Sequence, residues 1–237
     1  MLKVDQVCVR RSSVVTLKDV SLSLASGRTL AVVGESGAGK STLINAILGL
    51  VPCATGQMTW DAKPVRNCRP ALVMQEPRSA FNPRMSLRHS VMEPVRALHE
   101  DRLARLCSGL EIAPDLLDRR PTEVSIGQAQ RVGILRALIA APPLVLFDEP
   151  LSALDAVTQK HTARLIAQMQ REEGFAALIV THDLGYAAAF ADDIAVLRAG
   201  RLEEITPARA FVHAPQTAYG QTLRDAAFAL GALERVA

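Results

Sequence analysis

The hydrophobic positions of this chain change their spacing along its length. From residue 2 to residue 24 they alternate with polar residues, which predicts two strands that each bury one face. Further on, short runs of consecutive apolar residues predict strands that are buried on both faces. These runs are residues 30–33, 144–147 and 176–180. Residues 57–60 and 71–74 predict two more strands, and residues 194–197 and 202–205 predict a last hairpin turned by Ala199-Gly200.

Helical spacing separates these strands. It begins at residues 43–48, and it dominates residues 78–123, which show little strand character. Ser125 is a natural cap for a helix that stops at Pro142-Pro143. An amphipathic helix precedes the strand at 176–180, and two short helices finish the chain. We therefore predict one α/β domain, whose core with an antiparallel β part covers 1–77 and 124–237 and whose inserted helical lobe covers 78–123.

A glycine-rich segment joins the strand at 30–33 to the helix at 43–48. It follows the pattern G-x-x-x-x-G-K-S of a phosphate-binding P-loop, in which backbone N–H groups and a helix N-terminus face phosphate oxygens. We expect Lys40 to reach the β- and γ-phosphates and the Ser41 hydroxyl to hold Mg²⁺. The alternative is a glycine-rich turn beside a lysine, which the flanking strand and helix disfavour. The P-loop consists of Gly34, Glu35, Ser36, Gly37, Ala38, Gly39, Lys40, Ser41 and Thr42.

Three other predicted strands end in polar residues suited to phosphate chemistry. The run 144–147 is followed by Asp148, a predicted Mg²⁺ ligand, and by Glu149, placed to accept the proton of a water attacking the γ-phosphate. Gln75 follows the strand at 71–74 and is a candidate for ligating Mg²⁺ and touching that water. His182 follows the strand at 176–180 and is a candidate for holding the γ-phosphate. Each of these residues, taken alone, is also compatible with an ordinary polar strand end.

Composition excludes several classes of protein. The chain has 237 residues, 49% of them hydrophobic, which is enough for a sizeable core. Its net charge is only +3 and no cationic run marks a nucleic-acid surface. Its four scattered cysteines suit a reducing compartment better than a disulfide framework. The start of the chain has no apolar signal region, and no apolar run is long enough to span a membrane.

Arginine residues raise two open questions. No aromatic residue precedes Trp60, so an adenine ring would have to stack on another group, for which Arg11 and its neighbour Arg10 are candidates. A solvated pair of turn arginines is an equally good interpretation. The predicted lobe is basic, which is typical of a solvated helix face or, alternatively, of a partner surface. Its arginines are Arg78, Arg84, Arg88, Arg96, Arg102, Arg105, Arg119 and Arg120.

The order and spacing of these motifs resemble the ATP-binding cassette (ABC) ATPases along essentially the whole chain. Residues 34–42 match Walker A, Gln75 the Q-loop, 124–128 the signature, 144–149 Walker B, 152–155 the D-loop and His182 the switch histidine. The resemblance implies a P-loop NTPase (RecA-like) core and a head-to-tail ATPase dimer. It adds Ser125, Gly127 and Gln128 to the ATP-binding residues, with Ser125 and Gly127 contacting the γ-phosphate held by the partner subunit.

Within that family the chain is most similar to the peptide/nickel importer cassettes, through residues 74–85 and 214–219. This resemblance implies an ATP-hydrolysing subunit at the cytoplasmic face of the membrane, which drives uptake of peptides, nickel or a metal–chelator complex. The implied partners are an identical or related ATPase subunit, two integral membrane permease subunits and an outside substrate-binding protein, with no nucleic acid. The alternatives are a non-transport cassette of the phosphonate-metabolism type and an exporter cassette.

The signature departs from the usual L-S-G-G-Q of the family at Ile126. A β-branched side chain there replaces a glycine at the start of a helix, where it adds bulk and narrows backbone freedom. We therefore expect the site that this signature completes to be the slower one if the ATPase dimer is asymmetric. The sequence leaves open whether the dimer contains two copies of this chain.

Overall fold

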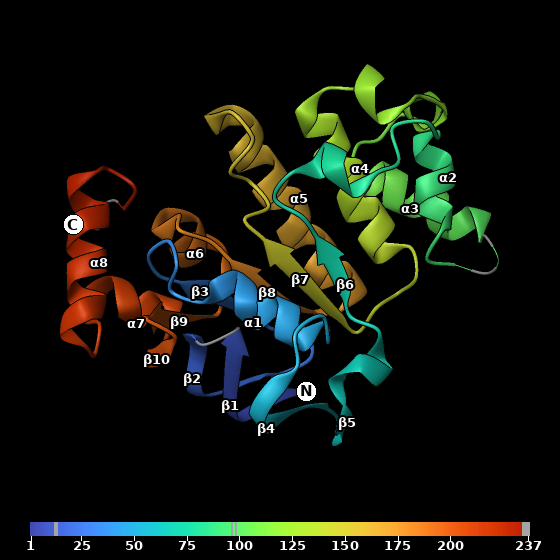
Figure 1. Cartoon of the computed structure of the whole chain (residues 1–237). Coiled ribbons are helices and arrows are strands. Elements are labelled where there is room, and N and C mark those ends of the chain that lie inside the picture. The colour runs from blue at the N-terminus through green and yellow to red at the C-terminus, as the bar shows by residue number, and fades with distance from the viewer. Residues whose placement is uncertain (12–13, 96, 98, 234–237) are drawn as a thin grey trace.

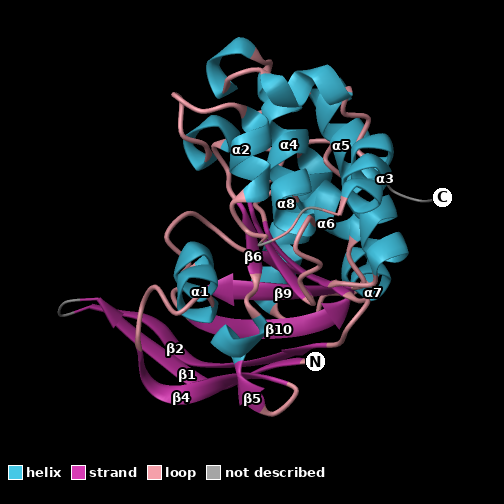
Figure 2. Ribbon diagram, turned by 90° about the vertical axis from the view of Figure 1, so that its right-hand side faces the viewer, coloured by secondary structure: helices cyan, strands magenta, loops and turns pink. Residues whose placement is uncertain are grey.

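Two β-sheets form the framework of the protein (Figures 1 and 2). The computed structural model describes residues 1–11, 14–95, 97 and 99–233. One sheet is antiparallel, has four strands and follows the order β2-β1-β4-β5. The other has six strands in the order β10-β9-β3-β8-β7-β6, and its central strands are parallel. The predicted α/β fold class is confirmed.

The strands lie close to the predicted segments. The antiparallel sheet contains β1 (Leu2–Arg11), β2 (Val14–Leu24), β4 (Cys53–Trp60) and β5 (Lys63–Pro64). The six-stranded sheet contains β3 (Thr29–Val33), β6 (Ala71–Val73), β7 (Leu144–Asp148), β8 (Ala176–Val180), β9 (Asp193–Arg198) and β10 (Arg201–Pro207). Because β3, β6, β7 and β8 run parallel, the P-loop, Gln75, Glu149 and His182 all follow strands at one edge of the sheet. The sequence prediction omitted the two-residue strand β5.

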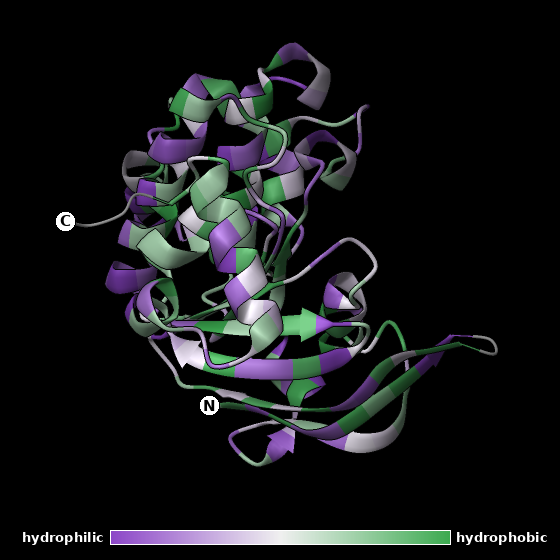
Figure 3. Cartoon of the chain, turned by 90° about the vertical axis from the view of Figure 1, so that its left-hand side faces the viewer, coloured by the Kyte–Doolittle hydropathy of each residue, from purple (hydrophilic) through white to green (hydrophobic). Residues whose placement is uncertain are grey.

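Helices cover both faces of the six-stranded sheet. Helix α1 (Lys40–Ile47) lies between the two sheets, and its Leu43 and Ile44 are buried in a cluster with residues of both (Figures 1 and 2). The other helices outside the predicted lobe are α4 (Ile126–Leu138), α5 (Ala156–Glu173), α6 (Leu184–Phe190), α7 (Ala208–His213) and α8 (Ala218–Ala229). Hydrophilic and hydrophobic residues alternate along the helices in Figure 3, as expected for elements that bury one face. Among the described residues, no helix combines the length and hydrophobicity needed to cross a bilayer.

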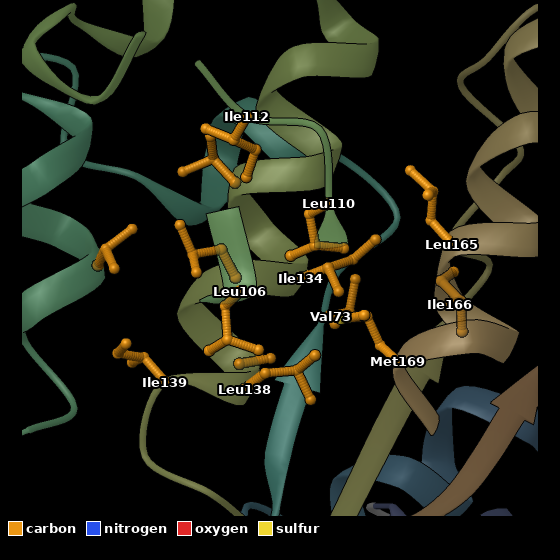
Figure 4. Packing of buried hydrophobic residues seen from close by; sticks show 14 of the residues in the cluster. Val73, Leu106, Leu110, Ile112, Ile134, Leu138, Ile139, Leu165, Ile166 and Met169 are labelled. Atoms are coloured by element: carbon orange, nitrogen blue, oxygen red, sulfur yellow. The ribbon is translucent and has the colours of Figure 1, made fainter. Parts of the chain in front are cut away.

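The segment predicted as a helical lobe contains α2 (Leu87–Met92), α3 (Glu100–Gly109) and short 3₁₀ turns in its described part. Its buried residues share one hydrophobic cluster with the core, in which Leu106 and Leu110 of α3 meet Ile134 of α4 and Val73 of β6 (Figure 4). Helix α4 therefore packs against both the lobe and the sheet. The division at residues 78 and 123 remains a prediction. Arg96 and Leu98, which belong to the basic and helical patterns of this segment, lie outside the described residues.

Most described arginines of this segment have structural partners. Arg88 pairs with Asp118, Arg119 with Asp115, and Arg102 and Arg105 both pair with Glu173 of α5. Arg102 is largely buried and also donates to the carbonyl oxygens of Leu138 and Ile139. Carboxylates therefore pair with these four arginines, of which Arg88, Arg105 and Arg119 are still exposed, as a solvated helix face or a partner surface requires.

Candidate active site

The P-loop backbone is fixed by close contacts at its two ends. Gly34 has φ 154°, and a Cβ there would lie 2.1 Å from the carbonyl oxygen of Leu197 in β9. Gly39 precedes α1 with φ 108°, and a Cβ there would lie 2.8 Å from the carbonyl oxygen of Thr16 in β2. Any side chain at either position would collide with backbone. The conformation therefore requires glycine at both positions, and it leaves Glu35, Ser36 and Gly37 exposed between them.

Lys40 spans the P-loop. Its ammonium group donates to the carbonyl oxygens of Gly34 at 2.7 Å and of Glu35 at 2.9 Å, and the residue is only 7% exposed. Burial lowers the pKa of Lys40, while the nearby carboxylates of Glu149 and Asp148 act in the opposite direction. A bound phosphate would supply the strong counter-charge that two carbonyl dipoles only partly replace.

Asp148, at the end of β7, faces the first turn of α1. Its Oδ1 lies 3.4 Å from the Ser41 hydroxyl. Burial raises the pKa of Asp148, with a further upward contribution from Glu149, whereas Ser41 and Lys40 lower it. A hydroxyl and a half-buried carboxylate are oxygen donors of the kind that Mg²⁺ prefers, so these residues fit the ion predicted from the sequence.

Gln75 follows β6 beside this group. Val73 of β6 is paired with Phe147 of β7, so the two strands reach the same edge of the sheet together. Gln75 is exposed two residues beyond that pair. The backbone is thus arranged as a Mg²⁺-binding role of Gln75 requires, and the role itself remains a prediction.

We expect Asp148→Asn to stabilise the nucleotide-free chain. Because the folded-state pKa of Asp148 is raised, its ionised form costs stability above that pKa, and the cost disappears as pH falls through it. Since the group is partly screened by solvent, the expected gain in melting temperature at pH 7 is about 1–3 °C. The same variant should lose the additional stabilisation that Mg²⁺ gives in the presence of ATP. Thermal unfolding between pH 4 and pH 7 measures both effects, and a lower melting temperature at pH 7 without ligand would contradict the assignment.

Glu149 and His182 form a direct pair. His182 Nδ1 lies 2.8 Å from Glu149 Oε2, with the histidine side chain 66% exposed and that of the glutamate 18% exposed. Glu149 has φ 46°, and its backbone N–H donates to the Val180 carbonyl oxygen at 2.9 Å while its own carbonyl accepts from Ser152. A positive φ at a non-glycine residue costs energy and is typical of functional sites. The backbone hydrogen bonds thus fix the position of Glu149, while the side chain of His182 is largely exposed to solvent.

The signature residues 124–128 form a capped helix start. The Ser125 hydroxyl accepts from the Gln128 N–H at 3.1 Å, and the Gln128 side chain accepts from the Ser125 N–H at 2.9 Å. The N–H groups of Ile126 and Gly127 have no hydrogen-bond partner within the described ranges. Two free donors at a helix N-terminus favour an anion. No hydrogen bond or ion pair joins this segment to the P-loop across the described part of the same chain.

The D-loop residues 152–155 end at the cap of α5. The Asp155 carboxylate accepts from the N–H groups of Val157 and Thr158 and from the Thr158 hydroxyl, and these bonds lower its pKa. A Cβ at Gly127 would lie 2.9 Å from the Thr158 methyl group, so the starts of α4 and α5 are in close contact. Ile126 is 42% exposed and Val157 82% exposed beside this contact.

The neighbourhood predicted to hold adenine is only partly described. Arg11 ends β1, is exposed and pairs with Val14 across the hairpin, whose residues 12–13 lie outside the described ranges. Thr16 and Leu17 of the same hairpin lie against Gly39, so β2 runs beside the P-loop. The stacking of adenine on Arg11 remains a prediction.

No sequence pattern indicated that α8 contacts the P-loop. Tyr219 of α8 lies next to Glu35, and the Arg198 guanidinium lies 4.5 Å from the centre of its ring. Burial raises the pKa of Tyr219. A cavity of about 600 Å³ also opens between α8, α6 and the start of the P-loop, with Gly34, Glu35 and His182 among its lining residues. Helix α6, whose first turn lines this cavity, was not predicted.

The geometry of the P-loop and the two carboxylates agrees with comparisons to known proteins. The sequence profile of the ABC transporter family matches residues 17–152, which is more than half of the chain. The chain belongs to the ABC transporter family of ATPases. This ABC ATPase is 36% identical over 225 residues to the oligopeptide transport ATP-binding protein OppF of Escherichia coli, an alignment that covers 87% of the chain and 67% of OppF. It is 37% identical over 205 residues to the E. coli nickel import ATP-binding protein NikE, covering 79% of the chain and 76% of NikE.

Solved structures agree with this assignment. The dimeric, post-hydrolysis state of the ATP-binding cassette MJ0796 bound to ADP and phosphate superimposes with a TM-score of 0.77 at 27% identity, covering 88% of this ABC ATPase and 99% of that chain. The structure of cbiO1 from Clostridium perfringens, part of the ABC transporter complex cbiONQ, gives a TM-score of 0.80 at 25% identity. The superposition covers 97% of this ABC ATPase and 95% of the cbiO1 chain. The predicted family and ATPase activity are thereby confirmed.

Proposed function

We propose that this ABC ATPase is the energy-coupling subunit of an importer for peptides, nickel or a metal–chelator complex. The proposal of ATP hydrolysis rests on one observation. The side chains of Lys40, Asp148, Glu149 and His182 lie close together at one edge of the sheet. The similarity to ATP-binding proteins named for oligopeptide and nickel import supports the kind of cargo. A glutathione import protein, GsiA of Pectobacterium atrosepticum, is 36% identical over 89% of the chain and 36% of its own length.

The proposed chemistry is attack of water on the γ-phosphate. Lys40 and the P-loop N–H groups bind the phosphates, and Glu149 accepts the proton of the attacking water. Ser41, Asp148 and Gln75 would hold Mg²⁺, which neutralises phosphate charge when bound. Because His182 Nδ1 contacts the Glu149 carboxylate, the imidazole would have to turn toward the γ-phosphate before the carboxylate could act as a base. The exposure of its side chain permits that movement.

Two ATPase subunits would complete each site. The free N–H groups of Ile126 and Gly127, together with the Ser125 hydroxyl, are available to the γ-phosphate held by a partner, with Gln128 fixing the helix start. Their lack of contact with the P-loop of their own chain supports this arrangement, and a dimeric relative of similar fold exists. The partner is a second copy of this chain or a related ATPase subunit.

The contact with the membrane is proposed at a groove beside the lobe. A cavity of about 980 Å³ lies between α4, β6 and the segment before α3, and its lining includes Met74, Val95 and Arg136. Met74, an exposed methionine next to Gln75, offers apolar contact area for a helix of a permease subunit. The ATPase would then be peripheral at the cytoplasmic face, with two permease subunits in the membrane and a binding protein outside.

Reconstitution of the complex in lipid vesicles tests this proposal. ATP hydrolysis should rise when the outside binding protein is added with its cargo, and peptide or nickel should accumulate in the compartment that contains the ATPase. If the ATPase does not co-purify with any integral membrane protein, that result would instead support a non-transport cassette. Transport that proceeds without a binding protein and in the outward direction would support an exporter.

A further inference from the structure

The segment that follows Gln75 is attached to α4 near both ends of that helix. A 3₁₀ turn at Pro77–Ala80 directs Arg78 to the start of α4, where its Nη2 donates to the Val124 carbonyl oxygen at 2.5 Å. At the far end, Arg136 of α4 donates to the Ala80 carbonyl oxygen and lies over the Phe81 ring, 5.9 Å from its centre. The segment and the helix are therefore connected at two points about one helix length apart.

Phe81 completes this attachment. It is 5% exposed and belongs to the same hydrophobic cluster as the α4 residues around it. A Cβ at Gly133, in the middle of α4, would lie 3.9 Å from the Phe81 ring, which is an ordinary packing distance. Two arginine–carbonyl bonds and one buried ring thus hold a short, tightly wound segment along a 13-residue helix.

The carbonyl of Val124, to which Arg78 donates, lies where the chain enters α4. Val124 is 3% exposed and has an extended backbone immediately before Ser125, the cap of α4. Fixing this carbonyl sets the angle at which the chain enters the helix, and so the direction of the free N–H groups of Ile126 and Gly127.

The positive charge of Arg78 beside the start of α4 does not stabilise that helix. A guanidinium beside a helix N-terminus opposes the helix dipole, so Arg78 makes the start of α4 more electropositive. No carboxylate pairs with Arg78 within the described ranges. Both features suit a helix start that receives an anion.

We propose that Arg78 is a positioning residue that couples Gln75 to the signature. Gln75 responds to Mg²⁺ and ATP in the P-loop of its own chain, and the 3₁₀ turn carries its displacement through the Arg78–Val124 bond to Ile126 and Gly127. Nucleotide binding at one site thereby changes the geometry of the signature, which contacts the nucleotide of the other site. This inference rests on the proposed roles of Gln75 and the signature.

Hydrogen–deuterium exchange of the full chain tests the coupling. It is measured with and without MgATP, at a protein concentration at which sedimentation shows the chain to be monomeric. We expect MgATP to slow exchange in the P-loop peptide, residues 34–42, and to change exchange in the signature peptide, residues 124–128, by about threefold or more. Arg78→Leu should abolish the change at 124–128 and leave the P-loop protection intact.

Two further variants separate coupling from mere folding. Arg78→Lys keeps a donor for the Val124 carbonyl and should restore part of the response. Arg84→Leu removes another exposed arginine close in the sequence, whose side chain has no partner in the part of the chain that the structure describes, and should respond as the wild type. In steady-state hydrolysis, measured with the partner subunit where one is needed, Arg78→Leu should lower kcat about tenfold at unchanged KM.

The outcomes distinguish this inference from the proposed function. If MgATP gives no protection at residues 34–42, nucleotide binding itself is wrong. If the P-loop is protected but 124–128 does not respond, or if Arg78→Leu responds as the wild type does, nucleotide binding stands and the coupling through Arg78 is overturned.

Discussion

Glu149→Gln is expected to lower kcat for ATP hydrolysis by about 10³-fold while leaving ATP affinity within about twofold of the wild type. The amide keeps the shape of the carboxylate and can still meet His182 Nδ1, but it cannot accept the proton of the attacking water. Because ATP then remains uncleaved, the subunits should stay together as an ATP-bound dimer. Phosphate release, equilibrium nucleotide binding and sedimentation measure the three effects.

Glu203→Gln provides the matched control for this change. Glu203 is an exposed carboxylate on β10, so its conversion to the amide removes the same charge at a position outside the site. We expect its turnover to equal that of the wild type. Turnover in Glu149→Gln as fast as in the control would remove Glu149 from the role of base.

Lys40→Met is expected to weaken ATP binding by about 100-fold or more. Methionine keeps most of the apolar stem but removes the ammonium group and its hydrogen bonds to charged phosphate, each of which contributes about 1.5–3 kcal/mol. Burial lowers the pKa of Lys40, which means that the charged form is costly to bury, so the loss of the ammonium group should not unfold the chain. Equilibrium titration with MgATP measures the affinity.

The exposed Lys63, at the edge of the antiparallel sheet, offers the corresponding control. Lys63→Met should bind ATP as the wild type does. Wild-type affinity in Lys40→Met, with normal thermal stability, would show that the phosphates bind elsewhere.

Part of the candidate site could be located from the sequence. Parallel buried strands bring the residues that follow them to one edge, so Asp148, Glu149 and His182 could be placed near the P-loop from apolar runs alone. The glycine pattern fixed the loop, because Gly34 and Gly39 occupy positions where any side chain would collide with backbone. Helix α6 was missed because it has only seven residues, too few to show a clear helical period.

Contacts between distant segments could not be predicted from one sequence. The pairing of His182 with Glu149 depends on side-chain rotamers, and the bond from Arg78 to Val124 spans 46 residues without any sequence motif. The partners of the lobe arginines follow from how α3 packs against α5, which periodicity does not specify. The Ile126 side chain is 42% exposed, which leaves it available for contact in the proposed dimer.

The central claim is that two such subunits hydrolyse MgATP at the site built by the P-loop, Asp148 and Glu149. The most direct test is phosphate release from MgATP as a function of protein concentration, for the chain alone and together with a related ATPase subunit. We predict Mg²⁺-dependent hydrolysis whose rate per chain rises with concentration until dimers are saturated, and which is about 10³-fold slower in the Glu149→Gln variant. A rate per chain that is independent of concentration, or hydrolysis in Glu149→Gln at the wild-type rate, would contradict the account.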